Sequence, residues 1–385
     1  MERKPVMRKD QNHLAMINRL IYYNALTLLT LHATCCPSAS QEVSPVSATV
    51  ASDKEPIFET FSEYLSVDLD WWTGENGRTA WKDCGLLSID LQDVRLKNLA
   101  KGLGGGFLRL GGSLDVAVKY LYSKQVEKWC KTPAIHKGKN WNLCLNFSRW
   151  DEINEFAMEA NLKLVFGMSY PGTNLGKNSA VPPLDVTQNL ALLKYSISKG
   201  YRLAAVELGE EIVPPDQASF KNFVDAYKLM KETIANLWPD PSNRPKLLGP
   251  CLGMGSAVGK DKCVGNSTCQ VSQLVKDFMD AVVHNEESYI DGYCMHGYNN
   301  DGGNGWKKAG FLSEVLHQAV ALKGELRKRS STMPLWLGES GPHNHGGIQN
   351  VTDRFISSLW YADALGKLAS IGVSEFGRQA LVCRK

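Results

Sequence analysis

The sequence contains no long apolar stretch, no strong excess of charge of one sign and no repeated Cys-x-x-Cys frame. No apolar run approaches the roughly 18 residues that span a bilayer, so an integral membrane protein is not expected. The 43 Lys and Arg nearly balance the 40 Asp and Glu, which gives no electrostatic reason to expect nucleic-acid binding. The 10 cysteines lack the spacing of a structural zinc site.

The composition is that of an ordinary globular protein. Of the 385 residues, 43% are hydrophobic and 22% are charged, which excludes disordered, collagen-like and coiled-coil proteins. The chain is long enough for one large α/β barrel or for two smaller domains.

The N-terminal 40 residues have the pattern of a secretory leader. A basic segment, 1–19, precedes an apolar run from Leu20 to Leu31 and a small-residue stretch, 36–40. Such a run is too short to span a membrane but suits a signal peptide, whose start could be Met1 or Met16. The alternative is an uncleaved, disordered arm. We expect a secreted protein, extracellular or delivered to a lysosome or vacuole, and peripheral membrane association stays open.

Glycosylation sequons and cysteine spacing agree with secretion. Asn146, Asn266 and Asn350 each begin an Asn-x-Ser/Thr triplet. In an oxidising compartment, Cys130 with Cys144 and Cys263 with Cys269 are plausible disulfide pairs, although connectivity cannot be read from sequence.

After residue 60, short β-like runs alternate with amphipathic helical segments. Eight such β-then-α units predict a parallel (β/α)₈ barrel. The rival is a doubly wound sheet, but its glycine fingerprint is missing, because Gly102–Gly106 precedes a strand instead of following one. The expected strands are 64–69, 107–110, 163–167, 203–208, 246–249, 292–296, 335–337 and 373–381, and the clearest helices are 149–160, 186–198, 220–237, 271–283, 310–327 and 352–368.

Two expected strand ends are acidic, at Glu207–Glu211 and at Glu339. In such barrels reactive side chains follow the strands, and a carboxylic acid facing a carboxylate is the minimum apparatus for cleaving a glycosidic bond. Strand alternation predicts that Glu211, rather than Glu210, points into the barrel mouth. The alternative is that both glutamates simply begin a helix, where acids suit the dipole.

Five motifs occur in an informative order along the chain. They are Leu69–Trp72, Leu108–Leu114, Arg149–Asn154, Glu207–Glu211 and Trp336–Gly341. Together they resemble the heparanase-like proteins of glycoside hydrolase family 79, especially the plant-type branch. The resemblance runs from about residue 43 to the C-terminus. It implies a TIM barrel and a retaining mechanism that needs no metal or other cofactor. It also implies endo-acting β-glucuronidase chemistry on a uronic-acid polysaccharide or proteoglycan glycan.

The resemblance also assigns roles by position. It implies that Glu211 is the general acid/base and Glu339 the nucleophile. It implies further that the sugar beside the cleaved bond is contacted by four side chains, Asp70, His296, Tyr298 and Gln379.

The residues leave other interpretations open. Arg109 fits a buried ion-pair partner better than a substrate clamp, and His296 could be a hydrogen-bonded wall residue. His343 and His345 lack an acidic third ligand at a recognisable spacing, so no metal site is expected there. The basic run Arg327–Arg329 could dock an acidic glycan, but a solvated helix end is the simpler interpretation.

Three positions depart from the family pattern. Glu210 stands where the family has an Asn that donates to a sugar hydroxyl, and an ionised carboxylate can only accept. We therefore expect Glu210 to line the substrate site and to weaken catalysis. The loop 341–347 lacks the expected Gly-Ala-Tyr stretch, and Ser169 replaces an expected Asn.

The ends of the chain also differ from the resemblance. The resemblance implies a further Gly-Asn-Tyr segment, the last barrel helix and a β-sandwich after Lys385, and it makes Val46–Val50 an orphan sandwich strand. We therefore expect a leader at 1–40, an orphan strand and linker at 41–60 and a truncated hydrolase barrel at 61–385. An inactive glycan-binding relative, or a chain that does not fold stably, are the alternatives to an active secreted hydrolase.

Overall fold

The computed structural model describes most of the chain after residue 57. The described ranges are 58–71, 84–124, 130, 134–136, 139–141, 143–173, 179–258, 269–285, 287–299, 305–307, 310–344 and 346–382, and all belong to one unit, Pro56–Lys385. The expected leader, the expected strand at 46–50, Cys263, Asn266 and His345 lie outside these ranges.

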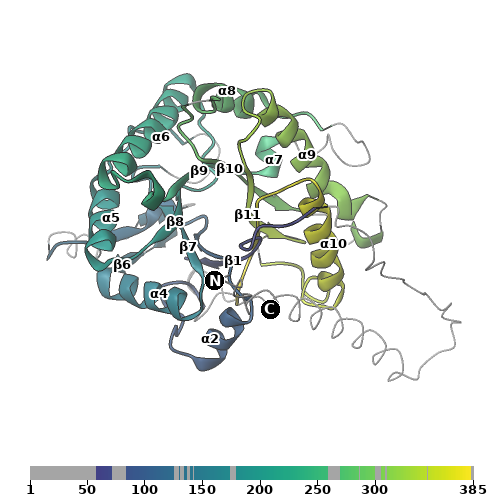
Figure 1. The fold of residues 1–385 in the computed structure, drawn as a ribbon, viewed down its shortest axis with the longest axis horizontal. Helices are drawn as coiled ribbons and strands as arrows, with labels where there is room; N and C mark the ends of the chain where they lie inside the picture. Colours follow the sequence, from purple (N-terminus) through teal and green to yellow (C-terminus); the bar gives the residue numbers. More distant parts are fainter. Residues whose placement is uncertain are drawn as a thin grey trace, which may run out of the picture. The chain divides into compact units, whose positions relative to one another are not determined.

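Eight parallel strands close into a barrel in the order β1-β12-β11-β10-β9-β8-β7-β2 (Figure 1). All eight predicted strands are present, and the prediction of a (β/α)₈ TIM barrel is confirmed. The strands are β1 (Leu65–Asp70), β2 (Phe107–Gly111), β7 (Lys163–Met168), β8 (Leu203–Leu208), β9 (Lys246–Gly253), β10 (Gly292–Tyr298), β11 (Leu335–Gly341) and β12 (Glu375–Arg378).

Helices form the outer ring around the strands (Figure 1). Six match predicted segments within a few residues, whereas α2 and the short α7 were not predicted. The helices are α2 (Val94–Lys101), α4 (Phe147–Glu159), α5 (Thr187–Lys199), α6 (Gln217–Leu237), α7 (Met254–Ala257), α8 (Gln273–Val282), α9 (Glu314–Arg327) and α10 (Ile356–Ser370).

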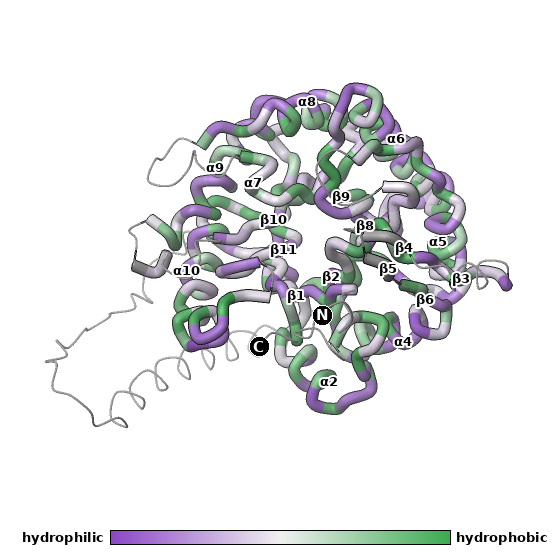
Figure 2. The backbone as a smooth tube through the Cα atoms, turned by 180° about the vertical axis from the view of Figure 1, so that it is seen from behind, coloured by the Kyte–Doolittle hydropathy of each residue, from purple (hydrophilic) through white to green (hydrophobic). Residues whose placement is uncertain are grey.

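Helix α8 shows how the sequence pattern produces this ring. Ser272 caps its N-terminus by accepting from the backbone N–H of Val275. Val275, Phe278 and Met279 are buried at i, i+3, i+4 spacing and face the barrel. The colouring of Figure 2 shows the same mixture of apolar and polar segments along the other outer helices.

The barrel interior is apolar where the strands begin and polar where they end. Its apolar part contains Phe107 and Trp336, whose rings lie 4.9 Å apart, together with Leu248. Two positions further along β2, Arg109 projects into the same interior because strand residues alternate. Because of this alternation, charged side chains such as Arg109 lie inside the barrel near the ends of the strands.

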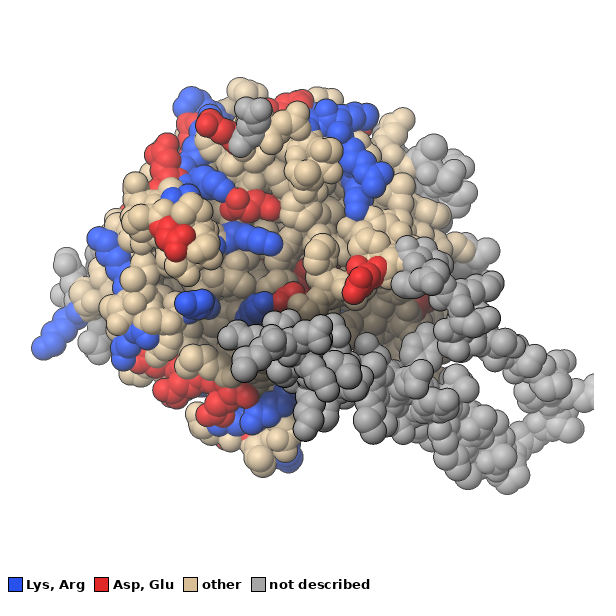
Figure 3. All heavy atoms as spheres, viewed as in Figure 1, with Lys and Arg blue, Asp and Glu red and all other residues tan. Residues whose placement is uncertain are grey.

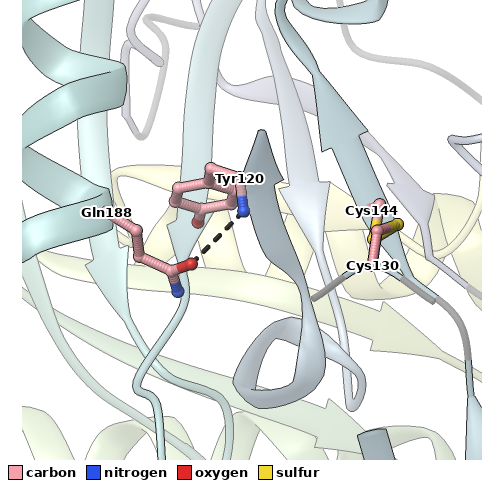
Figure 4. The surroundings of a disulfide bond; sticks show 4 residues. All are labelled: Tyr120, Cys130, Cys144 and Gln188. Carbon is pink, nitrogen blue, oxygen red and sulfur yellow. Dashed lines mark hydrogen bonds between the residues drawn. A yellow bond between two sulfur atoms is a disulfide. The ribbon is translucent and has the colours of Figure 1, made fainter. Parts of the chain in front are cut away.

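A disulfide-linked excursion separates β2 from α4. It contains strand β3 (Lys119–Leu121) paired with β6 (Cys144–Asn146), and the antiparallel pair β4 (Ala134–His136) and β5 (Lys139–Trp141). The predicted Cys130–Cys144 disulfide is present, with a Cα–Cα distance of 5.9 Å (Figure 4). Closing a loop of this size contributes about 3 kcal/mol in the chain-entropy account.

The neighbouring strand β3 is tied to the outer helices. Gln188 of α5 accepts from the Tyr120 backbone N–H at 3.2 Å, as Figure 4 shows. Cys84 and Cys269 each take part in a disulfide bond as well. Among helices in the described ranges, none has the length and apolar character required to cross a membrane.

Candidate active site

The guanidinium of Arg109 is the centre of a buried charge network at the carboxyl ends of the strands. It donates to Glu207 at 2.8 Å, to Glu210 at 2.7 Å and to Glu339 at 2.9 Å. Asp68 lies 4.0 Å away. Burial lowers the pKa of Arg109, but these carboxylates outweigh burial and raise it well above its usual value. The structure therefore confirms Arg109 as an ion-pair partner.

Glu339 lies on β11 and is held as a carboxylate. Its Oε1 accepts from Arg109, and its Oε2 accepts from the Tyr298 hydroxyl at 2.8 Å. Burial raises the pKa of Glu339, but the charges of His296 and Arg109 and these hydrogen bonds lower it to about 2. A buried, ionised carboxylate with fixed oxygens is suited to nucleophilic attack.

Glu210 is turned into the barrel, so the prediction that Glu211 rather than Glu210 points into the barrel mouth was wrong. The side chain of Glu210 is 1% exposed, whereas that of Glu211 is 40% exposed at the rim. The alternation argument failed because β8 ends at Leu208, after which Gly209 (φ +67°) and Glu211 (φ +48°) adopt left-handed conformations.

Glu210 and Glu211 nevertheless meet at the same imidazole. His296 Nδ1 lies 3.3 Å from Glu210 Oε1 and 3.2 Å from Glu211 Oε1. A β-carbon at Gly253 would stand 2.8 Å from Glu211 Oε1, so a glycine at the end of β9 leaves room for this carboxylate. Glu211 thus reaches the site from its edge and Glu210 from its floor.

His296 lies among three carboxyl groups, those of Glu210, Glu211 and Glu339. Burial lowers the pKa of His296, but the carboxylates of Glu210 and Glu339 raise it well above its usual value. Burial raises the pKa of Glu210 well above normal, reinforced by Glu339 and Glu211 and opposed by His296 and Arg109. Glu339 therefore favours the ionised form and Glu210 the protonated form, although their oxygens lie within 4.8 Å of one another.

Asp70 and Gln379 form a second polar contact at the barrel mouth. Gln379 Nε2 donates to Asp70 Oδ2 at 2.9 Å, and both residues are buried. Gly112 permits this arrangement, because a β-carbon there would lie 2.5 Å from Asp70 Oδ1 and its φ of +121° suits glycine. Of the five positions expected to line a sugar site, Glu210 contacts His296, Tyr298 contacts Glu339, and Asp70 contacts Gln379.

Other candidates lie away from these clusters. Ser169 is buried and its backbone N–H donates to the Tyr120 hydroxyl at 2.8 Å. The Nδ1 of His343 lies 2.8 Å from the carbonyl oxygen of Asn344. In the basic run, Lys328 pairs with Glu325 and Arg329 pairs with Asp280, as expected of a solvated helix end.

Sequence reasoning did not assign Asp68 and Glu207 to the site. Both are 1% exposed, and neither Asp68 oxygen accepts a hydrogen bond within the described part of the chain. Burial raises the pKa of Asp68, reinforced by Glu339 and Glu207 and opposed by Arg109 and His296. The sequence did carry a signal for Asp68. It lies two residues before Asp70 on β1, and side chains two residues apart on a strand point to the same face, here the inner one.

Two groups of described side chains have the spacing of metal ligands. In one, Glu210, His296 and Glu339 lie within 4.8 Å of one another. Arg109 donates to both of these carboxylates and already provides the positive charge there. The other group joins His296 to Cys251 and Cys294, two thiols buried in the apolar barrel interior. We assign no metal to either group.

Comparison with known proteins finds relatives among heparanase-like proteins and β-glucuronidases. The chain is 23% identical over 336 residues to heparanase-like protein 3 of Arabidopsis thaliana, covering 83% of this chain and 59% of that protein. It is 25% identical over 371 residues to baicalin-beta-D-glucuronidase of Scutellaria baicalensis (86% and 65%) and 24% identical over 369 residues to heparanase of Gallus gallus (85% and 65%). The chain thus spans about three fifths of the length of these relatives.

A solved structure supports the fold alone. The family 51 α-L-arabinofuranosidase AbfB of Bifidobacterium longum superposes with a TM-score of 0.51 at 12% identity, covering 87% of this chain and 70% of that one. The family model described as glycosyl hydrolase family 79, N-terminal domain, matches residues 46–366. With its barrel and its central glutamates, this chain is a member of glycoside hydrolase family 79.

Proposed function

We propose that the protein is a retaining glycoside hydrolase that cleaves β-glucuronides. The observation that carries this proposal is the state of Glu339, which is buried, ionised and fixed by Arg109 and Tyr298. A second carboxyl group, that of Glu211 just after β8, would complete the pair of acids that double displacement requires.

In the proposed mechanism Glu339 is the nucleophile and Glu211 the acid/base. A Glu339 oxygen attacks the anomeric carbon while Glu211 gives its proton to the leaving oxygen, which yields a glycosyl ester and a free alcohol. Glu211 then takes a proton from water, whose oxygen displaces Glu339. The 40% exposure of the Glu211 side chain suits a group that meets the departing sugar and then water.

The names of the relatives and the chemistry of the site support a proposal for the substrate class. Relatives include a baicalin-beta-D-glucuronidase, a hyaluronoglucuronidase and heparanases. We propose a glucuronic-acid-containing glycan of a proteoglycan or cell-wall glycoprotein. Tyr298, which is partly exposed two residues after the fully buried His296, would contact the sugar at the cleaved bond. The pair Asp70 and Gln379 supplies acceptors and a donor for sugar hydroxyls.

Glu210 favours a second candidate, glycan binding without turnover. The carboxyl group of Glu210 contacts Arg109 and His296. Arg109 also donates to Glu339, and His296 lies within 4.8 Å of it, so Glu210 shares both partners with the proposed nucleophile. If the purified protein binds a glucuronide oligosaccharide in calorimetry but does not cleave it, Glu210→Asn should restore turnover, because an amide donor replaces an extra acid. Binding and turnover both absent in wild type and variant would exclude both candidates.

We also propose a secretory route, extracellular or ending in a lysosome or vacuole. Support comes from the leader-like sequence at 1–40 and from the Cys130–Cys144 disulfide. Asn146 and Asn350 are exposed, as glycosylation requires. Endoglycosidase treatment of protein from a eukaryotic secretion host should lower its mass, and unchanged mass would argue against glycosylation.

Replacing Glu339 tests the nucleophile. Glu339→Gln should lower the release of an aryl β-glucuronide chromophore by at least about 10³-fold, in the range that loss of a nucleophile costs other hydrolases. Glu159→Gln, an exposed glutamate on α4, is the matched control and should retain the wild-type rate. Equal rates for Glu339→Gln and wild type, with both folded by circular dichroism, would remove the assignment.

Substrates with different leaving groups test which neighbour donates the proton. Glu211→Gln should slow cleavage of a poor, alkyl-type leaving group by about 10²- to 10⁴-fold. It should slow an activated nitrophenyl glucuronide much less, because that leaving group needs little protonation. Glu210→Gln should show no such dependence on the leaving group. The reverse pattern would make Glu210 the acid/base.

The buried carboxyl of Glu210 predicts a pH-dependent stability difference. Because its folded pKa is raised above the ordinary 4.5, its contribution to stability is complete below pH 4.5 and is lost as pH rises through the raised value. The Tm of Glu210→Gln minus that of wild type should therefore increase between about pH 4 and pH 8. Glu159→Gln should not show this rise, because Lys97 lowers the pKa of Glu159. A difference that stays constant for Glu210→Gln contradicts the burial argument.

A further inference from the structure

A cavity of about 860 Å³ lies at the end of the barrel where the strands begin. Its walls include the first residues of four strands, Phe107, Lys163, Leu203 and Lys246, and the ends of α4, α5 and α6. The candidate active site lies at the opposite end, where the strands finish. The cavity therefore belongs to a separate surface, and its volume is within the range of ligand sites.

The cavity is positively charged. Lys163, Arg202, Arg244 and Lys246 line it, against one carboxylate, Glu63, which pairs with Lys163. Within the described part of the chain, Arg202 and Lys246 are exposed and form no ion pair. Figure 3, which looks onto this end, shows Lys and Arg side chains over β7, β8 and β9, interspersed with some Asp and Glu.

Aromatic rings stand beside these cations. Tyr201 and Trp238 are half-buried in the cavity wall. The Tyr201 hydroxyl donates to Asp151 Oδ1 at 2.8 Å, which fixes its ring. The Arg244 guanidinium donates to the backbone oxygens of Trp238 and Pro239 at 2.6 and 2.9 Å. Lys246 Nζ lies 5.4 Å from the ring centroid of Trp336.

We propose that this cavity is a second binding site for an anionic oligosaccharide. Sugar rings present C–H faces that pack on aromatic side chains, and uronate or sulfate groups would pair with the exposed cations Arg202 and Lys246. The choice of a saccharide over another anion rests on the proposed function, because a hydrolase of uronic-acid polymers meets long anionic chains. The site would hold the polymer remotely from the cleaved bond.

The other basic segment does not compete with this cavity. In the run Arg327–Arg329, Lys328 and Arg329 are already engaged by Glu325 and Asp280. Substitutions there remove the same amount of charge without touching the cavity. The double variant Arg327→Gln/Lys328→Gln is therefore a matched control for Arg202→Gln/Lys246→Gln.

Calorimetry with sulfated and unsulfated uronic-acid hexasaccharides tests the proposal. Both double variants are made in the full chain carrying Glu339→Gln, so that slow cleavage does not disturb binding. Two sites are expected in the parent. Arg202→Gln/Lys246→Gln should weaken one of them about tenfold, in line with two exposed charge pairs, and the control should keep both. Hydrogen exchange should show ligand protection at 201–204 and 238–246 in the parent and in the control, and weaker protection in the cavity variant.

The outcomes separate this site from the proposed function. Equal binding by the cavity variant and the control, or no protection at 201–204 and 238–246, overturns the cavity site even if the enzyme cleaves glucuronides. Selective loss in the cavity variant supports the site even if wild type cleaves nothing. Preference for inorganic sulfate over both hexasaccharides would make it a simple anion site and overturn the saccharide assignment. Thermal melts of both variants exclude unfolding as the cause.

Discussion

The ion pairs of Arg109 are the interaction on which the candidate site depends. Its side chain is 1% exposed and faces Asp68, Glu207, Glu210 and Glu339 at 4.0 Å or less. Removing one partner of a buried ion pair typically destabilises a protein by about 3–5 kcal/mol, because the other charge stays buried and unpaired. One guanidinium thus makes it possible for several carboxyl groups to share the polar end of a barrel whose interior is apolar where the strands begin. The catalytic proposal rests on that charge balance.

The same network gives neighbouring carboxyl groups different protonation. Glu339 receives hydrogen bonds from Arg109 and Tyr298, whereas Glu210 lies deeper among other acids and shares Arg109. Pairs of acids whose environments separate their pKa values are a recurring basis of acid and base roles. Here the two acids whose pKa values are separated are Glu339, whose pKa is lowered, and Glu210, whose pKa is raised. Glu210, which stands where the family resemblance implies Asn, is therefore the residue on which the two proposed functions, catalysis and binding alone, differ.

The sequence predicted the fold well because its signals were local. Eight apolar strand runs and the amphipathic helices each carry their own periodicity, and the two acidic strand ends followed from those runs. Glu210 was misplaced because the argument extended strand alternation past Leu208, where left-handed backbone at Gly209 and Glu211 ends it. The convergence of Asp68, Glu207 and Glu339 on Arg109 joins strands far apart in sequence. Only closure of the barrel brings them together.

The central claim is that the ionised carboxylate of Glu339 attacks the sugar. The most direct measurement is mass spectrometry of protein treated with an activated 2-deoxy-2-fluoro-glucuronide, which slows breakdown of a glycosyl ester. One sugar per chain, attached to the peptide that contains Glu339, is the expected result. Attachment to Glu210 or Glu211, or hydrolysis with inversion and no attached sugar, would contradict the account.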